Sequence, residues 1–332
     1  MKEKLTKRDP SIDIWKGLLV ILMVWAHVIQ LIGDRNHSWA QREISDLVNV
    51  TAFSSFLFSF GYVTYLSYFS RQVDYRRIGA SLLKILFAYY VLSMAIQLLI
   101  QSEIDARKMV FDTLTFNTIT IYTEFLPAFG LALLVGALFA KPLGWMVQSL
   151  RHMLIFSALF LLTAFVPDVS FHFPQMALFL GAFGLEIRSY PLAEYMPLFL
   201  AGFYMARHHI KYQRIWFMIG VAGVASFYIY RVFLGLPERF PPSSEWVFFS
   251  VFFTICGYQI VRLVQAPALV SDYLSTIGAN TLFFFVVSTI LIIILQRHFD
   301  GLNMFATLLG ATGIMTVTCF LSRLIRPAPM NG

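Results

Sequence analysis

The stretch DIWKGLLVILMVWAHV, Asp13 to Val28, is apolar enough for a membrane-spanning helix, yet it contains Lys16 and His27. Ionisable side chains inside a bilayer are costly, and those found there usually serve a function. At about 100° per residue, the step between these two positions is about three helical turns, so both side chains lie on one face, about 16 Å apart along the axis. This geometry suits a long ligand lying along the helix, anionic at one end and reactive at the other.

The composition places the whole chain in the membrane. Of its 332 residues, 58% are hydrophobic and 13% are charged, whereas soluble domains have about 25% charged residues. We therefore expect an all-α polytopic membrane protein that forms a single domain over residues 1–332. Cys256 and Cys319 lie in apolar stretches, which favours neither a disulfide framework nor a metal site.

Ten segments approach the roughly 20 apolar residues that a span requires. They are 12–32, 50–69, 78–100, 119–140, 152–167, 190–206, 215–235, 246–264, 277–295 and 304–322. The apolar piece 174–187 is short for a span, so we interpret it as a re-entrant or interfacial segment. The sequence thus predicts about ten transmembrane helices and one such short segment.

Basic residues predict the orientation. With ten spans and a cytoplasmic N-terminus, the inner loops hold roughly twice as many lysines and arginines as the outer loops, the asymmetry typical of membrane proteins. Both termini are therefore predicted to be cytoplasmic. The net charge of +7 follows from the same bias. Because no basic domain stands outside the membrane, we expect no nucleic-acid partner.

Further basic residues surround the cytoplasmic end of the third segment. Lys84 lies within this segment, and Arg76 and Arg77 precede it. Together with Lys16 they could bind phosphate groups by charge and hydrogen bonding. The structural alternative is that Lys16 extends to the interface and that the arginines are ordinary positive-inside residues.

Two charged residues are expected near the depth of His27. Glu124 lies near the outer end of the fourth segment, and Arg231 lies near the outer end of the seventh. A carboxylate beside a histidine orients the ring and raises its basicity, as general-base catalysis requires. The structural alternatives are a Glu124–Arg231 ion pair and a packing role for His27.

Six stretches together resemble one family. IDIWKGLLVILMVWAH resembles the first helix of the acyltransferase family 3 membrane proteins, with Lys16 where arginine is usual. The other five stretches, SSFLFSFGYV, SLLKILFAYY, EFLPAFGLALL, PLFLAGFYMAR and LSTIGANTLFFFVVS, are similar to later helices, so the resemblance spans about residues 11–290. The departures from the family pattern are at Phe60, Ser81, Ala88, Glu124, Phe285 and Ser288. The heparan-glucosaminide N-acetyltransferase-like membrane proteins share the first-helix pattern.

The resemblance implies an enzyme. Such a protein would be a membrane O-acyltransferase that moves an acyl group, typically acetyl, from cytoplasmic acyl-CoA to a hydroxyl of a glycan or lipid-linked sugar. His27 would be the base, assisted by Glu124. The predicted contacts to CoA are Lys16, Arg76, Arg77 and Lys84, and those to the acceptor are Arg231 and Asn280. The expected location is the bacterial inner membrane, with the lipid bilayer and the glycan acceptor as partners; a homo-oligomer stays open.

Two other functions fit the same residues. A secondary transporter would use the buried ionisable groups as a proton relay, although no internal repeat supports a fold of duplicated halves. A non-catalytic protein of polysaccharide assembly would explain the departures at Ser81 and Ser288 as lost catalysis. Binding of acyl-CoA separates the enzyme from both alternatives.

Overall fold

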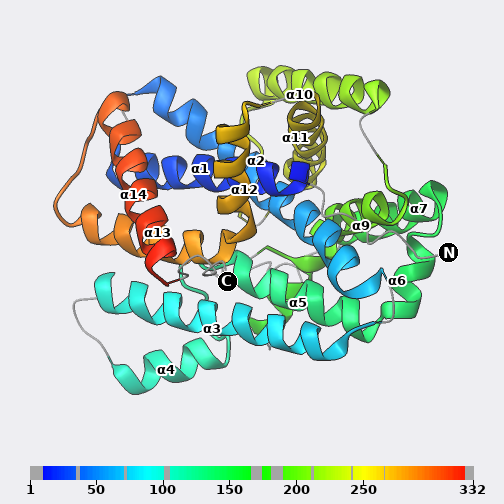
Figure 1. Cartoon of the computed structure of the whole chain (residues 1–332), viewed down its shortest axis with the longest axis horizontal. Helices are drawn as coiled ribbons and strands as arrows, with labels where there is room; N and C mark the ends of the chain where they lie inside the picture. The colour runs from blue at the N-terminus through cyan, green and yellow to red at the C-terminus, as the bar shows by residue number, and fades with distance from the viewer. Residues whose placement is uncertain are drawn as a thin grey trace, which may run out of the picture.

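The computed structural model describes residues 10–34, 38–70, 73–100, 105–165, 174–180, 190–210, 213–240, 242–264 and 266–325, and these ranges form a bundle of helices (Figure 1). The α-helices are α1 (Pro10–Ile32), α2 (Trp39–Thr64), α3 (Tyr75–Ile100), α4 (Ala106–Leu114), α5 (Phe125–Leu138), α6 (Ala140–Met146), α7 (Leu150–Leu161), α8 (Ala177–Leu180), α9 (Leu192–Arg207), α10 (Arg214–Leu234), α11 (Ser244–Leu263), α12 (Ala268–Ala279), α13 (Thr281–Gln296) and α14 (Met304–Ile325). A π-helical turn, η1 (Tyr65–Phe69), extends α2, and two 3₁₀ turns are η2 (Leu162–Phe165) and η3 (Pro174–Met176).

The expected all-helical membrane architecture is confirmed, with fewer clear spans than ten. Six helices within the described ranges are long and apolar enough to cross a bilayer, namely α1, α2 with η1, α3, α10, α11 and α14. Two bent pairs, α5–α6 at 95° and α12–α13 at 84°, raise the number to eight if each pair is one span. The other two expected spans correspond to α7 and α9, which have 12 and 16 residues.

The short apolar segment expected at 174–187 is only partly within the described residues. Residues 174–180 form η3 and α8, together two short turns, and residues 181–189 lie outside the described ranges. A re-entrant or interfacial position for this segment therefore stays a prediction.

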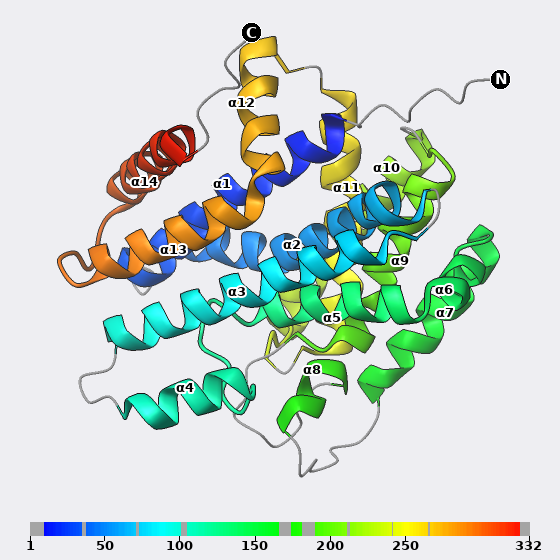
Figure 2. The ribbon, with the colours of Figure 1, turned by 60° about the horizontal axis from the view of Figure 1, so that its bottom comes forward.

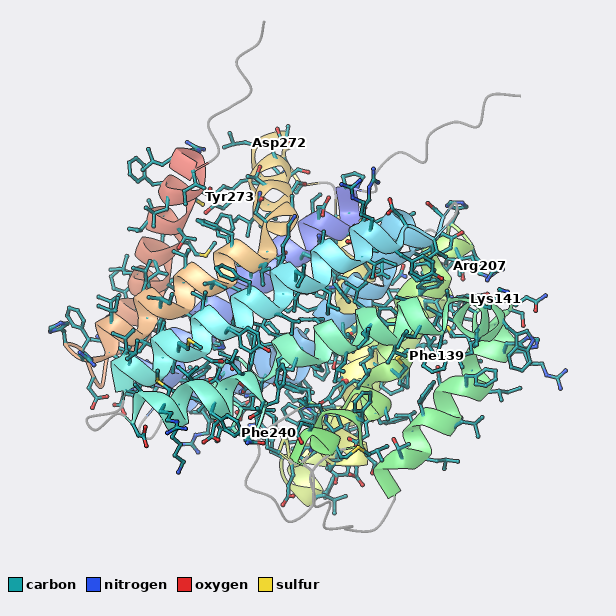
Figure 3. All side chains as sticks on the ribbon, turned by 90° about the horizontal axis from the view of Figure 1, so that it is seen from below. Phe139, Lys141, Arg207, Phe240, Asp272 and Tyr273 are labelled. Carbon is teal, nitrogen blue, oxygen red and sulfur yellow. The ribbon has the colours of Figure 1, made fainter. Side chains whose placement is uncertain are left out.

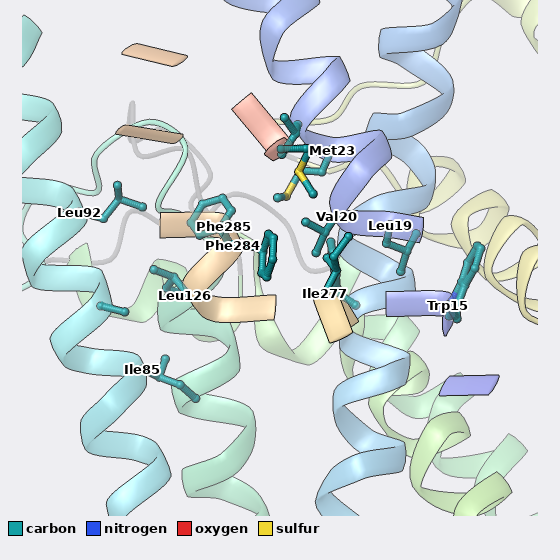
Figure 4. Packing of buried hydrophobic residues seen from close by; sticks show 14 of the residues in the cluster. Trp15, Leu19, Val20, Met23, Ile85, Leu92, Leu126, Ile277, Phe284 and Phe285 are labelled. Atoms are coloured by element: carbon teal, nitrogen blue, oxygen red, sulfur yellow. The ribbon is translucent and has the colours of Figure 1, made fainter. Parts of the chain in front are cut away.

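The centre of the bundle is α1, which packs against α2, α11, α12, α13 and α14. Its buried side chains include Trp15, Leu19 and Val20, and they meet Phe284 and Phe285 of α13 in one hydrophobic cluster (Figure 4). A helix that is apolar on all sides is typically enclosed by other helices. The apolar side chains of α1 thus lie largely inside the bundle.

Glycines let α1 and α12 cross at backbone contact. A Cβ atom on Gly17 would lie 2.0 Å from the carbonyl oxygen of Leu274, and one on Gly278 would lie 1.9 Å from that of Asp13. Small residues at such crossings allow close helix packing in membranes. The crossing holds the end of α12 beside the N-terminal half of α1, and the chain then turns sharply into α13 (Figure 2).

Candidate active site

The break between α12 and α13 exposes the first turn of a helix inside the bundle. Asn280 occupies the N-cap position of α13 but provides no side-chain cap, since its amide Nδ2 donates to the carbonyl oxygen of Thr276 at 2.9 Å. The first backbone amides of a helix lack intrahelical partners and carry partial positive charge. The start of α13 is therefore suited to an anion.

A groove of about 550 Å³ begins at this helix start. Lys16, Lys84 and Asn280 contribute to its lining, and the remaining walls are largely apolar and come from α1, α2, α3, α5 and α13. The ammonium of Lys16 lies 2.8 Å from the carboxylate of Asp13, one turn earlier, whereas Lys84 is exposed. Two of the four predicted CoA contacts and one predicted acceptor contact thus lie together at one groove.

The two predicted arginines lie elsewhere on α3. Arg76 and Arg77 are exposed, and neither is among the described residues that line the groove. The guanidinium of Arg77 pairs with Asp74 at 3.1 Å. The structure therefore brings Lys16 and Lys84 together and leaves the arginine pair on the surface before them.

A second, smaller pocket of about 40 Å³ adjoins the groove. The two cavities share Met23, Phe56 and Phe125 in their linings. His27 and Glu124, the two predicted catalytic residues, both line the small pocket. The expected alignment of Lys16 and His27 on one side of α1 is thus found, with Met23 between them facing both cavities.

His27 is held by aromatic rings and retains an unused nitrogen. Its ring meets Tyr122 edge-on with 4.8 Å between centroids, and Phe285 at 6.4 Å. The Nδ1 atom is buried and makes no hydrogen bond to any described residue. Tyr122 itself has a φ of 68°, a strained conformation that often marks functional sites. The pocket therefore offers an oriented histidine with capacity for a polar partner.

Three further polar residues complete the pocket, and sequence reasoning missed them. Asn49 comes from α2, Tyr190 precedes α9, and Arg239 lies between α10 and α11. Arg239 donates from Nε and Nη2 to the hydroxyl of Tyr190 at 3.1 and 2.6 Å, and its charge interacts with that of Glu124. The cation near Glu124 is therefore Arg239.

Arg231 has a different place from the one expected. Its guanidinium forms a two-pronged ion pair with Glu43 at 2.6 and 2.7 Å and also contacts Asp46 at 3.1 Å. The structural interpretation of a Glu124–Arg231 pair is wrong, because α10 faces the first turns of α2 at this point. Among the described residues that line the two cavities, Arg231 is absent, which indicates a role in joining α10 to α2.

The fold and site together define a class: a polytopic helical membrane protein in which a groove with a basic end adjoins a pocket lined by a half-buried histidine. The model of the family described as an acyltransferase domain, acyltransferase family 3, matches residues 9–325. The chain therefore belongs to acyltransferase family 3, and it is a membrane acyltransferase in the general sense. No curated protein and no solved structure was found to match it.

Proposed function

We propose that this protein transfers an acyl group, specifically acetyl, from cytoplasmic acyl-CoA to a hydroxyl of a glycan or lipid-linked sugar. The observation that carries this proposal is the pair of adjoining cavities. The groove is lined by two lysines and a helix start, and the small pocket, which shares Met23, Phe56 and Phe125 with it, is lined by His27. This arrangement supports anion recognition and acyl transfer along one path, as a long donor requires.

The donor's phosphates would lie by Lys16, Lys84 and the first turn of α13. Lysine ammonium groups and helix N-termini both favour phosphate. The pantetheine arm would then follow α1 over about 16 Å, the rise from Lys16 to His27. Arg76 and Arg77 would add positive charge outside the groove, at the mouth through which the donor enters.

The acceptor hydroxyl would react in the small pocket. His27 would take the hydroxyl proton as its oxygen attacks the thioester carbonyl, and the CoA thiolate would then leave with that proton. Glu124 is proposed to stabilise the protonated histidine electrostatically, which is the role of a carboxylate near a catalytic base. Holding the reacting groups of both substrates beside His27 would supply a large part of the rate enhancement. Asn280 and Arg231, predicted as acceptor contacts, lie at the groove end and at the α2–α10 contact, so we do not assign them to the reacting hydroxyl.

Replacing Lys84 with methionine should raise the KM for acyl-CoA about tenfold, equivalent to about 1.4 kcal/mol of binding, with little change in kcat. A phosphate contact is made equally in the ground state and transition state, so its loss weakens binding alone. Steady-state kinetics in detergent or nanodiscs measure this. Lys141→Met is the matched control, because Lys141 is exposed on α6 and away from the groove. An unchanged KM in the Lys84 variant would show that this lysine only reaches the interface.

The proposed orientation has ten crossing segments, including α7 and α9, with both termini in the cytoplasm. Lys141 and Arg207 lie near each other at one end of the bundle (Figure 3), and Arg207 donates to the backbone of Gly144. Single cysteines at Ser38 and Gln213 should be labelled from opposite sides of sealed vesicles, with Ser38 accessible from outside the cell. Labelling of both from one side would contradict the orientation.

Direct binding separates the three candidate functions. Purified protein should bind acetyl-CoA with saturation and consume it only when an acceptor glycan is present. A transporter would show proton-coupled solute uptake in proteoliposomes without acyl-CoA binding, and a polysaccharide-assembly protein would bind glycan without acyl-CoA. Absence of acyl-CoA binding by folded protein would overturn the proposed enzyme function.

A further inference from the structure

We infer that Tyr190, held by Arg239, donates the hydrogen bond that stabilises the oxyanion formed during acyl transfer; this inference rests on the proposed function. Attack on a thioester carbonyl places negative charge on its oxygen, and donors aimed at that charge are a major source of catalysis. The small pocket contains His27 as base, and it requires a donor for the oxyanion as well. Tyr190 lines that same pocket.

The hydrogen-bond inventory of the Tyr190 hydroxyl identifies it as a donor. A phenol oxygen has two acceptor positions and one hydrogen. Two N–H groups of Arg239 point at this oxygen, at 3.1 and 2.6 Å, and so occupy its acceptor capacity. No described residue accepts the hydroxyl hydrogen of Tyr190. That hydrogen remains available to a group bound in the pocket.

The guanidinium also strengthens the donor. Tyr190 is buried beside the Arg239 guanidinium, and a phenol, with an ordinary pKa of about 10, keeps its proton at neutral pH. An ionised group bonded to the phenol oxygen polarises the O–H bond, and hydrogen bonds in a chain strengthen one another in a low-dielectric site. The result is a neutral donor suited to a developing negative charge.

The ring of Tyr190 is fixed before any substrate arrives. It stacks on Phe53 with 3.8 Å between centroids and 17° between planes, and it meets Phe240 edge-on at 5.2 Å. The guanidinium of Arg239 lies over the Phe240 ring at 4.7 Å. Preorganised donors need no reorganisation during the reaction, which is what makes them effective.

The chemical step balances with these groups alone. The acceptor oxygen forms a bond to the acyl carbon while His27 takes the hydroxyl proton, and the carbonyl π electrons move onto the oxygen that faces Tyr190. Collapse of the intermediate restores the carbonyl, breaks the carbon–sulfur bond, and returns the proton from His27 to the thiolate. Tyr190 keeps its proton throughout and contributes only the hydrogen bond.

The test is Tyr190→Phe, which removes the hydroxyl and keeps the stacked ring. Loss of one oxyanion donor typically lowers kcat by about 10²–10³-fold. The KM for acetyl-CoA and the binding of CoA should stay within about twofold, because the contact is made only in the transition state. Tyr195→Phe is the matched control: its ring lies 5.6 Å from that of Tyr190, yet Tyr195 is not among the described residues lining either cavity.

A sulfur-substituted donor separates catalysis from a packing defect. Wild-type protein should use dithioacetyl-CoA, in which sulfur replaces the carbonyl oxygen, much more slowly than acetyl-CoA, because sulfur is a weak acceptor. In Tyr190→Phe this preference should largely disappear, whereas a structural defect would slow both donors equally. Full kcat in Tyr190→Phe, or an unchanged donor preference, would overturn the inference while leaving wild-type transfer intact. Absence of transfer by the wild type would instead refute the proposed function.

Discussion

Replacement of His27 by alanine is expected to abolish detectable acyl transfer while the protein stays folded and still binds acyl-CoA. A positioned general base contributes about 10²–10⁴-fold in rate, and His27 is the histidine that lines the pocket next to the groove. The groove that would hold CoA is lined by other residues, so donor affinity should persist. Transfer of radiolabelled acetyl groups and equilibrium binding of CoA measure the two quantities separately.

His27→Gln distinguishes the base from a packing residue. Glutamine keeps much of the size and polarity of histidine but accepts no proton at neutral pH, so it should be as inactive as alanine. His298→Ala serves as the control, because His298 is exposed and is not among the described residues of either cavity. Activity restored by glutamine would assign His27 to hydrogen bonding or packing and would move the search for the base to Glu124.

Gly278→Val is expected to be the most damaging single change to the fold. The new Cβ would lie 1.9 Å from the backbone oxygen of Asp13, and a backbone atom cannot rotate away. Overpacking typically costs about 1–3 kcal/mol and sometimes more, and this overlap should reach the upper end or beyond. Because α12 leads directly into α13, displacement of the crossing would also move the helix start at the groove. Thermal unfolding should show a marked loss of Tm, and surviving protein should bind acyl-CoA weakly.

The matched control for this substitution is Gly313→Ala on α14. A Cβ atom there would meet nothing within 4 Å, so the exchange should leave Tm unchanged or slightly raised, since alanine favours helix. A Gly278→Val protein with wild-type Tm and donor binding would show that α1 and α12 do not need backbone contact.

The sequence predicts the apolar helices well because length and hydropathy suffice for them. The predicted segments 12–32, 78–100, 215–235 and 304–322 match α1, α3, α10 and α14 closely. The start of α2 escaped detection because its buried face is polar. Gln41, Ser45 and Asp46 are buried there, and side chains of other helices bond to the last two, namely Gln30 to Ser45 and Arg231 to Asp46. A hydropathy average along the sequence registers the polarity of these residues but contains no information about their partners in the fold.

Breaks inside apolar runs could not be predicted either. Residues 277–295 form one largely apolar stretch, yet the helix axis turns by 84° at Asn280. The turn depends on the close crossing of α12 with α1, a contact between positions more than 250 residues apart. Gly278 and Asn280 are the local signs of that turn, and they acquire meaning only when the crossing is known.

The residues of the candidate site also fall into two groups, those that the sequence predicts and those that it does not. Lys16, Lys84, His27 and Glu124 were found because charged groups within apolar helices are conspicuous. Tyr190 was missed because it is an uncharged aromatic residue at the edge of the expected span 190–206, and Arg239 was missed because it lies in a connecting segment, where arginine is ordinary. Their only local signs are neighbouring aromatic and proline residues, in RSYP and ERFPP, and only the folded chain brings them to His27.

The central claim is that this protein acylates a surface glycan, and mass spectrometry of surface glycans tests it most directly. Glycans from cells that lack the protein should lose one acyl mass increment that wild-type cells carry. Expression of the wild-type chain should restore that increment, and expression of His27→Ala at the same level should not. Identical glycan masses in cells with and without the protein would contradict the claim.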